Sequence, residues 1–124
     1  MPSLLQAEAQ PKDFAKVARV IYNRLDKDMR LQLDTTVLYA LGRSGTHLSP
    51  DELQTDSPYN TYKNKGLPPT PIDSPGQQAI NAALHPAKGN WLYYVTTNLK
   101  TGETKFTNSY QEFLQFKKEL KGNS

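Results

Sequence analysis

The chain has 124 residues, of which 36% are hydrophobic, and a formal net charge of +3 at pH 7. This length fits a single domain with a modest core, and no apolar run approaches the roughly 18 residues needed to span a membrane. The absence of cysteine excludes disulfides, thiolate metal sites and a cysteine nucleophile. Because the lysines are scattered, the mild positive charge favours a solvated surface over a nucleic-acid patch.

The first 25 residues predict two helices. Residues 3–10 form a short helical pattern that ends near Pro11. Residues 13–25 form the strongest helix, because Val17, Ile21 and their neighbours repeat at helical spacing along one face.

Shorter elements follow in the middle of the chain. Residues 31–33 are expected to be extended, and Asp34 is expected to cap a helix that runs through Leu41, with Gly42 just beyond its end. Ser49-Pro50-Asp51-Glu52 has the spacing of a capping box and predicts another short helix.

A polar, proline-rich loop is expected from Asp56 to Asp73. Ser74-Pro75-Gly76-Gln77 then has the pattern of a second capping box, which would open a helix that continues to Leu84 and stops before Pro86.

The C-terminal part predicts a hairpin and one more helix. Residues 91–98 are rich in aromatic and β-branched residues, and residues 103–107 return as the partner strand after a turn. Ser109-Tyr110-Gln111-Glu112 caps the final helix. The predicted fold class is therefore α+β, with several short helices, one C-terminal β-hairpin and a final helix, in a single domain over residues 1–124.

The sequence has few candidates for catalytic chemistry. It lacks a phosphate loop, a dinucleotide fingerprint and a His-Glu-x-x-His motif, and His47 and His85 are far apart. Among the carboxylates, Glu8 is distinctive because helical spacing places it beside Leu4 and Leu5. Apolar surroundings raise the pKa of a carboxyl group and suit it to general acid catalysis. The alternative is a solvated glutamate on a fraying helix.

Four polar residues could line a cleft or serve the fold. Asn23 and Arg24 end the long helix and could present an amide and a guanidinium at a cleft mouth, or Arg24 could pair with a nearby aspartate. Gln32 and Asp34 flank Leu33 and would share one face of an extended segment, unless Asp34 is only a helix cap.

The segment Tyr59-Asn60-Thr61-Tyr62, followed by a Gly-Leu-Pro-Pro turn, suggests carbohydrate binding. Tyrosine rings stack on the C–H faces of sugars, and amides and hydroxyls pair with sugar hydroxyl and acetamido groups. The alternative is a loop that is held in place by its own hydrogen bonds.

Several blocks in order resemble one family, the endolytic murein transglycosylases, also called YceG-like or MltG-like. The blocks are Gln6-Ala7-Glu8-Ala9, residues 16–25, residues 31–41, Ser57-Pro58-Tyr59-Asn60-Thr61-Tyr62, Gly66-Leu67-Pro68-Pro69-Thr70-Pro71-Ile72 and Trp91-Leu92-Tyr93-Tyr94-Val95. The sequences of the first two blocks are similar to those of the actinobacterial branch.

The resemblance implies cleavage of the β-1,4 bond between N-acetylmuramic acid and N-acetylglucosamine, without water, to leave 1,6-anhydro ends and help terminate nascent glycan strands. Members usually carry an N-terminal membrane anchor and a LysM-like region, so this chain would be a catalytic subdomain that lacks both. The implied location is the extracytoplasmic face of the bacterial cell membrane. The implied partners are peptidoglycan strands and the cell-wall synthesis machinery, with no nucleic acid, metal or cofactor.

The family's catalytic glutamate falls on Glu8, and Gln6 stands where many members have a second glutamate. Thr35 and Thr70 depart from the family pattern, which commonly has proline and glycine there. The implied substrate-binding residues are Asn23, Arg24, Gln32, Asp34, Tyr39, Tyr59, Asn60, Thr61 and Tyr62.

Three other functions stay open at this point. A lysozyme-type hydrolase would pair Glu8 with Asp34 or Asp56 as its second carboxylate. A peptidoglycan-binding module would use the tyrosine cluster and leave Glu8 without a catalytic role. An interaction domain would dock on the cell-wall synthesis machinery.

Overall fold

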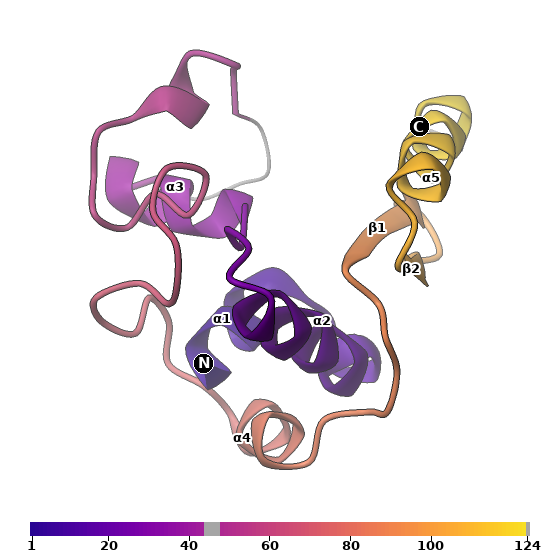
Figure 1. The fold of residues 1–124 in the computed structure, drawn as a ribbon, viewed down its shortest axis with the longest axis horizontal. Coiled ribbons are helices and arrows are strands. Elements are labelled where there is room, and N and C mark those ends of the chain that lie inside the picture. Colours follow the sequence, from indigo (N-terminus) through magenta and orange to yellow (C-terminus); the bar gives the residue numbers. More distant parts are fainter. Residues whose placement is uncertain (44–47, 124) are drawn as a thin grey trace.

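The computed structural model describes residues 1–43 and 48–123. Three helices, α1 (Pro2–Glu8), α2 (Phe14–Asp26) and α4 (Gln77–Leu84), pack together as a helical base (Figure 1). A single 3-10 turn, η1 (Pro11–Asp13), joins the first two. The structure therefore confirms the two predicted N-terminal helices and the α+β class.

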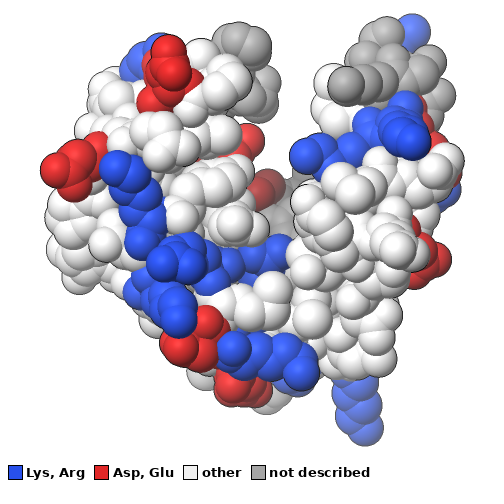
Figure 2. Space-filling model, turned by 45° about the horizontal axis from the view of Figure 1, so that its top comes forward, with Lys and Arg blue, Asp and Glu red and all other residues white. Residues whose placement is uncertain are grey.

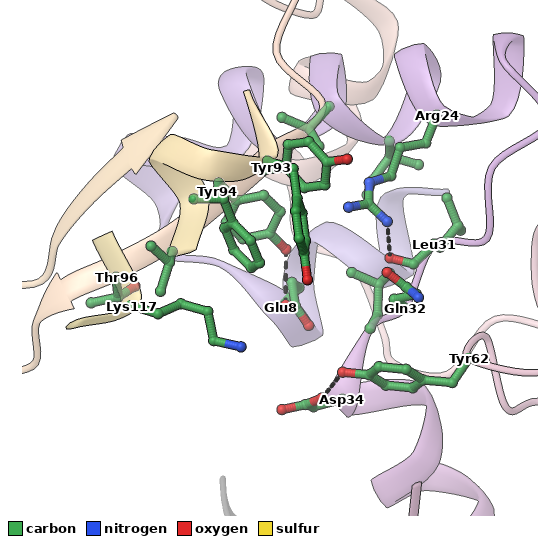
Figure 3. Close-up of a pocket in the computed structure, with 16 residues that line it drawn as sticks. Glu8, Arg24, Leu31, Gln32, Asp34, Tyr62, Tyr93, Tyr94, Thr96 and Lys117 are labelled. Carbon is green, nitrogen blue, oxygen red and sulfur yellow. Dashed lines mark hydrogen bonds between the residues drawn. The ribbon is translucent and has the colours of Figure 1, made fainter. Parts of the chain in front are cut away.

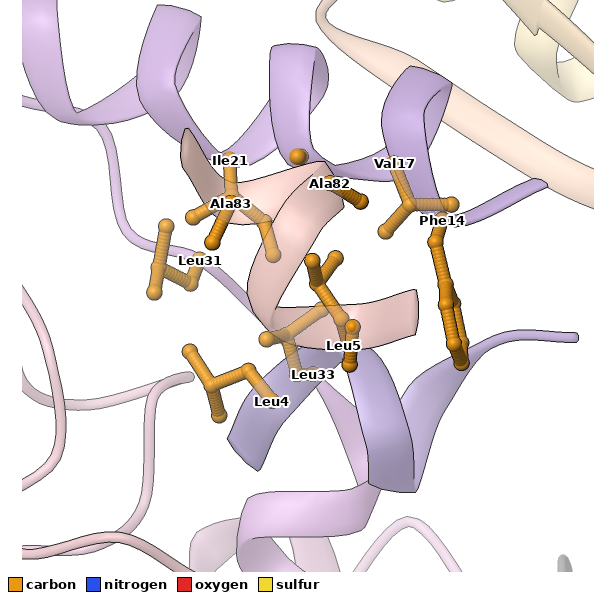
Figure 4. Packing of buried hydrophobic residues seen from close by; sticks show 11 residues of the cluster. Leu4, Leu5, Phe14, Val17, Ile21, Leu31, Leu33, Ala82 and Ala83 are labelled. Atoms are coloured by element: carbon orange, nitrogen blue, oxygen red, sulfur yellow. The ribbon is translucent and has the colours of Figure 1, made fainter. Parts of the chain in front are cut away.

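The core lies where these three helices meet. Leu4 and Leu5 of α1 are at most 1% exposed and contact the apolar face of α2 (Figure 4). Small residues of α4, chiefly Ala79 and Ala83, let that helix approach closely. Each buried leucine contributes about 2 kcal/mol of hydrophobic stabilisation, so α1 is held by its packing although it is only seven residues long.

One flank of the base consists of α3 (Asp34–Leu41), the 3-10 turn η2 (Glu52–Gln54) and the long loop that follows (Figure 1). Gly42 ends α3 with a φ of 68°, as predicted, because glycine tolerates the left-handed conformation. The predicted capping box also forms, since the Ser49 and Glu52 side chains each accept a hydrogen bond from the other's backbone N–H. His47 lies outside the described residues.

Three local predictions between residues 31 and 77 are wrong. Leu33 and not Asp34 is the N-cap residue of α3, and the helix has no side-chain cap. Residues 31–33 are not extended throughout, because Gln32 adopts a left-handed φ of 53°. The Ser74 capping box does not form either: Gly76 is the N-cap residue of α4, and its N–H donates to the Gln6 side chain at 2.9 Å.

The opposite flank is the predicted hairpin with its helix. β1 (Tyr93–Asn98) and β2 (Glu103–Thr107) pair antiparallel, with Tyr94 opposite Phe106. The last helix, α5 (Tyr110–Asn123), covers the hairpin, and the rings of Tyr93 and Phe113 stack at 5.2 Å. A two-stranded sheet is marginal alone, so α5 supplies the apolar cover that it needs.

The long loop is held by buried side-chain hydrogen bonds. Asn60 is completely buried, and its amide nitrogen donates to the carbonyls of Leu53 and Thr55 at 2.9 and 2.8 Å. Its amide oxygen accepts from the backbone N–H of Tyr62. Thr61 is 2% exposed, and its hydroxyl accepts a hydrogen bond from the Leu33 N–H. The same hydroxyl shares a hydrogen bond with the hydroxyl of Thr36. These bonds replace the missing regular structure in this segment.

We predict that Asn60→Ala lowers the free energy of unfolding by about 2–3 kcal/mol, because it leaves two carbonyls and one N–H without their partner. Urea unfolding followed by circular dichroism would measure the loss. The matched control is Asn90→Ala at an exposed asparagine, which should change stability by less than about 0.5 kcal/mol. Equal effects of the two substitutions would contradict this account of the loop.

Candidate active site

A cavity of about 440 Å³ is lined by residues of the helical base and of both flanks. The space-filling view shows it as an open cleft with acidic atoms at its floor (Figure 2). Its lining combines carboxylates, cations and aromatic rings from α1, α2, α3, β1 and α5. The residues are Glu8, Val20, Ile21, Arg24, Leu31, Gln32, Leu33, Asp34, Tyr62, Tyr93, Tyr94, Val95, Thr96, Tyr110, Phe113 and Lys117.

Glu8 is the last residue of α1 and holds the centre of this cavity (Figure 3). Its Oε1 accepts a hydrogen bond from the Tyr94 hydroxyl at 2.8 Å, and its Oε2 accepts one from the Thr35 hydroxyl at 2.9 Å. Because Tyr94 belongs to the hairpin and Thr35 to α3, the carboxylate joins the base to both flanks. Two donors on different elements fix its orientation.

The pKa of Glu8 is raised from 4.5 to about 7. Burial of the carboxyl group is the main cause, and the negative charge of Asp34 adds to it. The hydrogen bonds from Tyr94 and Thr35 act in the opposite direction, because they stabilise the charged form. A carboxyl group with this pKa exists in both protonation states near neutral pH, as a group that donates and then accepts a proton requires.

Arg24 shapes the wall beside Glu8. Arg24 is 7% exposed, and its guanidinium donates to the carbonyls of Leu92, Arg30 and Leu31 at 2.7, 2.7 and 3.2 Å. These bonds fix the backbone just before Gln32, whose left-handed φ turns it into the cavity lining. The alternative of an Arg24–aspartate ion pair is absent from the described part of the chain.

Asp34 and Tyr62 form the wall opposite the hairpin (Figure 3). The Tyr62 hydroxyl donates a short hydrogen bond to the Asp34 carboxylate. Burial and this bond raise the pKa of Tyr62 above its usual value. The pair presents an aromatic ring and a carboxylate to the same cavity as Glu8.

Of the residues predicted to bind substrate, the cavity brings together Arg24, Gln32, Asp34 and Tyr62 around Glu8. We predicted that Gln32 and Asp34 share one face because the segment is extended. The segment is not extended at Gln32, so this reason is wrong, although both residues line the cavity.

The other five predicted binding residues do not line it. Asn23 donates to the carbonyls of Gly89 and Trp91. Asn60 and Thr61 are buried inside the loop, as described above. Tyr39 and Tyr59 instead contact each other, with ring centroids 5.0 Å apart.

Sequence analysis missed the hairpin side of the cavity. Tyr93, Tyr94, Tyr110, Phe113 and Lys117 all line it, and Tyr94 is 86 residues from its partner Glu8 in sequence. The aromatic strand was visible in the sequence, but alternation alone does not show which tyrosine faces a distant glutamate.

A second cavity of about 270 Å³ adjoins the first. Glu8, Tyr94 and Thr96 line both cavities, and the second continues past Gln10 to Gly102 in the hairpin turn. Glu8 therefore borders both cavities.

The fold and the site together define an α+β domain with one carboxylic acid of raised pKa in an open, aromatic-walled cleft. No group of three or more potential metal ligands occurs within residues 1–43 and 48–123. The YceG-like family model matches residues 1–119, so the chain belongs to the YceG-like family.

Two curated relatives and one solved structure show the extent of the similarity. The chain is 48% identical over 113 residues to a Bacillus subtilis (strain 168) protein named endolytic murein transglycosylase, covering 90% of this chain and 31% of that protein. A Streptococcus pneumoniae (strain D39) protein of the same name is 39% identical over 116 residues, covering 89% of this chain and 21% of that one. A crystal structure described as that of a yceG-like protein from Listeria monocytogenes has 46% identity and a TM-score of 0.86, covering 93% of this chain and 38% of that one.

The chain thus spans about a third or less of the length of these two curated relatives. Within its described residues, no helix has the length and apolar character needed to cross a membrane. The actinobacterial branch stays a prediction, since none of these three organisms is an actinobacterium.

We predict that Glu8 makes folding stability depend on pH. Because its folded pKa is about 7 against 4.5 unfolded, its contribution is complete below pH 4.5 and is lost as pH rises through 7. The loss is on the order of 3 kcal/mol at ~1.4 kcal/mol per pKa unit. Urea unfolding at pH 4.5 and pH 8 should show this loss in the wild type and not in Glu8→Gln. Exposed Asp51→Asn is the control and should follow the wild type.

We also predict that Tyr94→Phe raises the pKa of Glu8 above 7, because it removes a hydrogen bond that stabilises the carboxylate. Carboxyl ¹³C chemical shifts of labelled glutamate, followed against pH, would report the change. Tyr93→Phe is the matched control, since Tyr93 lines the same cavity and its hydroxyl does not bond Glu8. An unchanged or lowered Glu8 pKa in Tyr94→Phe would contradict the assigned contact.

Proposed function

We propose that this chain is the catalytic part of an endolytic peptidoglycan lytic transglycosylase, which cleaves the bond between N-acetylmuramic acid and N-acetylglucosamine. The observation that carries the proposal is Glu8, a carboxyl group with a pKa of about 7 in an open cleft. The relatives named endolytic murein transglycosylase support the choice of substrate.

In the proposed reaction, protonated Glu8 donates its proton to the glycosidic oxygen as the bond from the muramic C1 breaks. The resulting Glu8 carboxylate then takes the proton of the C6 hydroxyl of the same muramic residue. As it loses this proton, the C6 oxygen attacks C1 and closes a 1,6-anhydro ring, so Glu8 ends the reaction protonated again. The reaction consumes no water, because the nucleophile is a hydroxyl of the substrate. One carboxylic acid therefore suffices where a hydrolase uses two carboxylates.

The remaining cavity residues would position the sugar. Tyr62 offers a ring face for stacking, and Gln32 offers an amide for the acetamido group. The Asp34 carboxylate would stabilise the positive charge that develops on the ring in the transition state. The individual roles of these three residues are part of the proposal.

The presence of Glu8 in the lining of both cavities supports cleavage within a strand. An internal bond has sugar residues on both sides, and both need space beside the acid. Cutting nascent strands internally would end their growth, in contact with the cell-wall synthesis machinery. Such an enzyme would work at the outer face of the cell membrane, attached there by a membrane anchor.

A lysozyme-type hydrolase is the second candidate, because Asp34 lines the same cavity as Glu8 and provides a second carboxylate. Asp56, the other partner considered from sequence, lines neither cavity. The products separate the two functions: hydrolysis leaves reducing ends, whereas the transglycosylase leaves anhydro ends one water lighter.

We predict that this chain, substituted for the matching segment of the Bacillus subtilis relative, releases muropeptides with 1,6-anhydro ends from purified peptidoglycan. Glu8→Gln should reduce the release at least 100-fold, because general acid catalysis contributes on the order of 10²–10⁴. Mass spectrometry of the products is the measurement, and Glu119→Gln on α5, at a residue outside both cavities, is the control.

Reducing ends instead of anhydro ends would establish the hydrolase. Binding to peptidoglycan with no release by the wild-type chimera would favour a binding module. Full activity of Glu8→Gln would rule out the proposed acid.

A further inference from the structure

Lys117 is a cation on the α5 wall of the cleft that the proposed mechanism does not use. It lines the 440 Å³ cavity, and its ammonium group points into the open space in front of Glu8 (Figure 3). It is exposed, and it stands on the flank opposite Asp34 and Tyr62.

Within the described residues, no carboxylate forms an ion pair with Lys117. Lys105, also on this flank, by contrast pairs with Glu119 of α5 at 2.9 Å. Its ammonium lies 5.3 Å from the ring of Phe113, one turn earlier on the same helix. This contact directs the side chain along the cavity wall without neutralising it.

The cavity's other cation is already engaged. Arg24 is buried and donates three hydrogen bonds to backbone carbonyls, so it is part of the cavity wall. Lys117 is therefore the exposed cation among the described residues that line the cavity. A neutral sugar ring gives an ammonium group no ionic partner, so a charged substituent is the better match.

We propose that Lys117 binds a carboxylate carried by the muramic residue, either on its lactyl group or on the peptide attached there. The inference rests on the proposed function, because it takes peptidoglycan as the ligand. In that ligand the muramic residue next to the scissile bond must lie at Glu8, and its lactyl substituent is the branch that leaves the sugar chain. Lys117 would thereby select peptidoglycan over glycans without carboxylates.

The test is a binding measurement on the Glu8→Gln chain, which removes turnover. Three soluble ligands of equal sugar length are compared by calorimetry. One is a glycan with intact peptide stems, one has its stems removed to leave free lactyl carboxylates, and one is an N-acetylglucosamine oligomer. Each is measured with Lys117, Lys117→Ala and Lys117→Arg, at low and high salt.

Lys117→Ala should weaken binding of at least one carboxylate-bearing ligand by about twofold to fivefold, the range of an exposed ion pair. Lys117→Arg should retain most of the affinity, and high salt should reduce the difference. A loss confined to the stem-bearing glycan identifies a peptide carboxylate, and a loss with the stem-free glycan identifies the lactyl group. Lys118→Ala, at an exposed neighbour outside both cavities, is the control.

Equal weakening for the N-acetylglucosamine oligomer, no effect on any ligand, or no detectable binding would overturn the role of Lys117. Because the readout is binding by an inactive variant, it is independent of the product assay. Lys117-dependent binding together with absent anhydro products would refute the proposed reaction and leave this inference standing.

Discussion

The Glu8 carboxylate, with the Tyr94 hydroxyl on one oxygen and the Thr35 hydroxyl on the other, is the contact on which the site's geometry depends. It joins the end of α1 to the hairpin and to α3, elements that otherwise have few direct contacts with one another. The helical base alone could not fix the distance between the two flanks. Because the proposed acid is also a structural junction, the shape of the cleft depends on the position of Glu8.

The three positions that depart from the family pattern each make a hydrogen bond. Gln6 accepts from the N–H of Gly76 and joins α1 to the start of α4. Thr70 bonds the hydroxyl of Tyr59 at 2.7 Å and holds the proline-rich turn against the loop. Thr35 donates to Glu8 itself. A proline at position 35 could not donate this bond, so Thr35 acts directly on the pKa of Glu8.

The sequence predicted those features that short-range patterns determine. The apolar stripe of α2, the hairpin and the position of Glu8 beside Leu4 and Leu5 all follow from the spacing of neighbouring residues. The left-handed backbone of Gln32 does not, because it depends on Arg24 holding the preceding carbonyls. The same limit applies to pairs such as Glu8 and Tyr94, whose meeting depends on how the two flanks pack.

The loop from residue 59 to 62 shows how composition can mislead about role. Its amides and hydroxyls match those of a sugar-binding surface, yet Asn60 and Thr61 point inward and bond the backbone. A loop without regular structure must satisfy its own polar groups when it is buried, and Asn and Thr do this with short side chains. Tyr62 reaches the cleft because its neighbours hold the loop from within.

The placement of Arg24 is compatible with the proposed role of Glu8 as a proton donor. A guanidinium in direct contact with Glu8 would lower the pKa of the carboxyl group and leave it ionised at neutral pH, unable to donate a proton. Three backbone carbonyls instead engage Arg24, while two neutral hydroxyls bond Glu8. Neutral donors orient a carboxylate and stabilise it less than a full positive charge would. Burial can therefore keep the pKa of Glu8 near 7 while its geometry stays fixed.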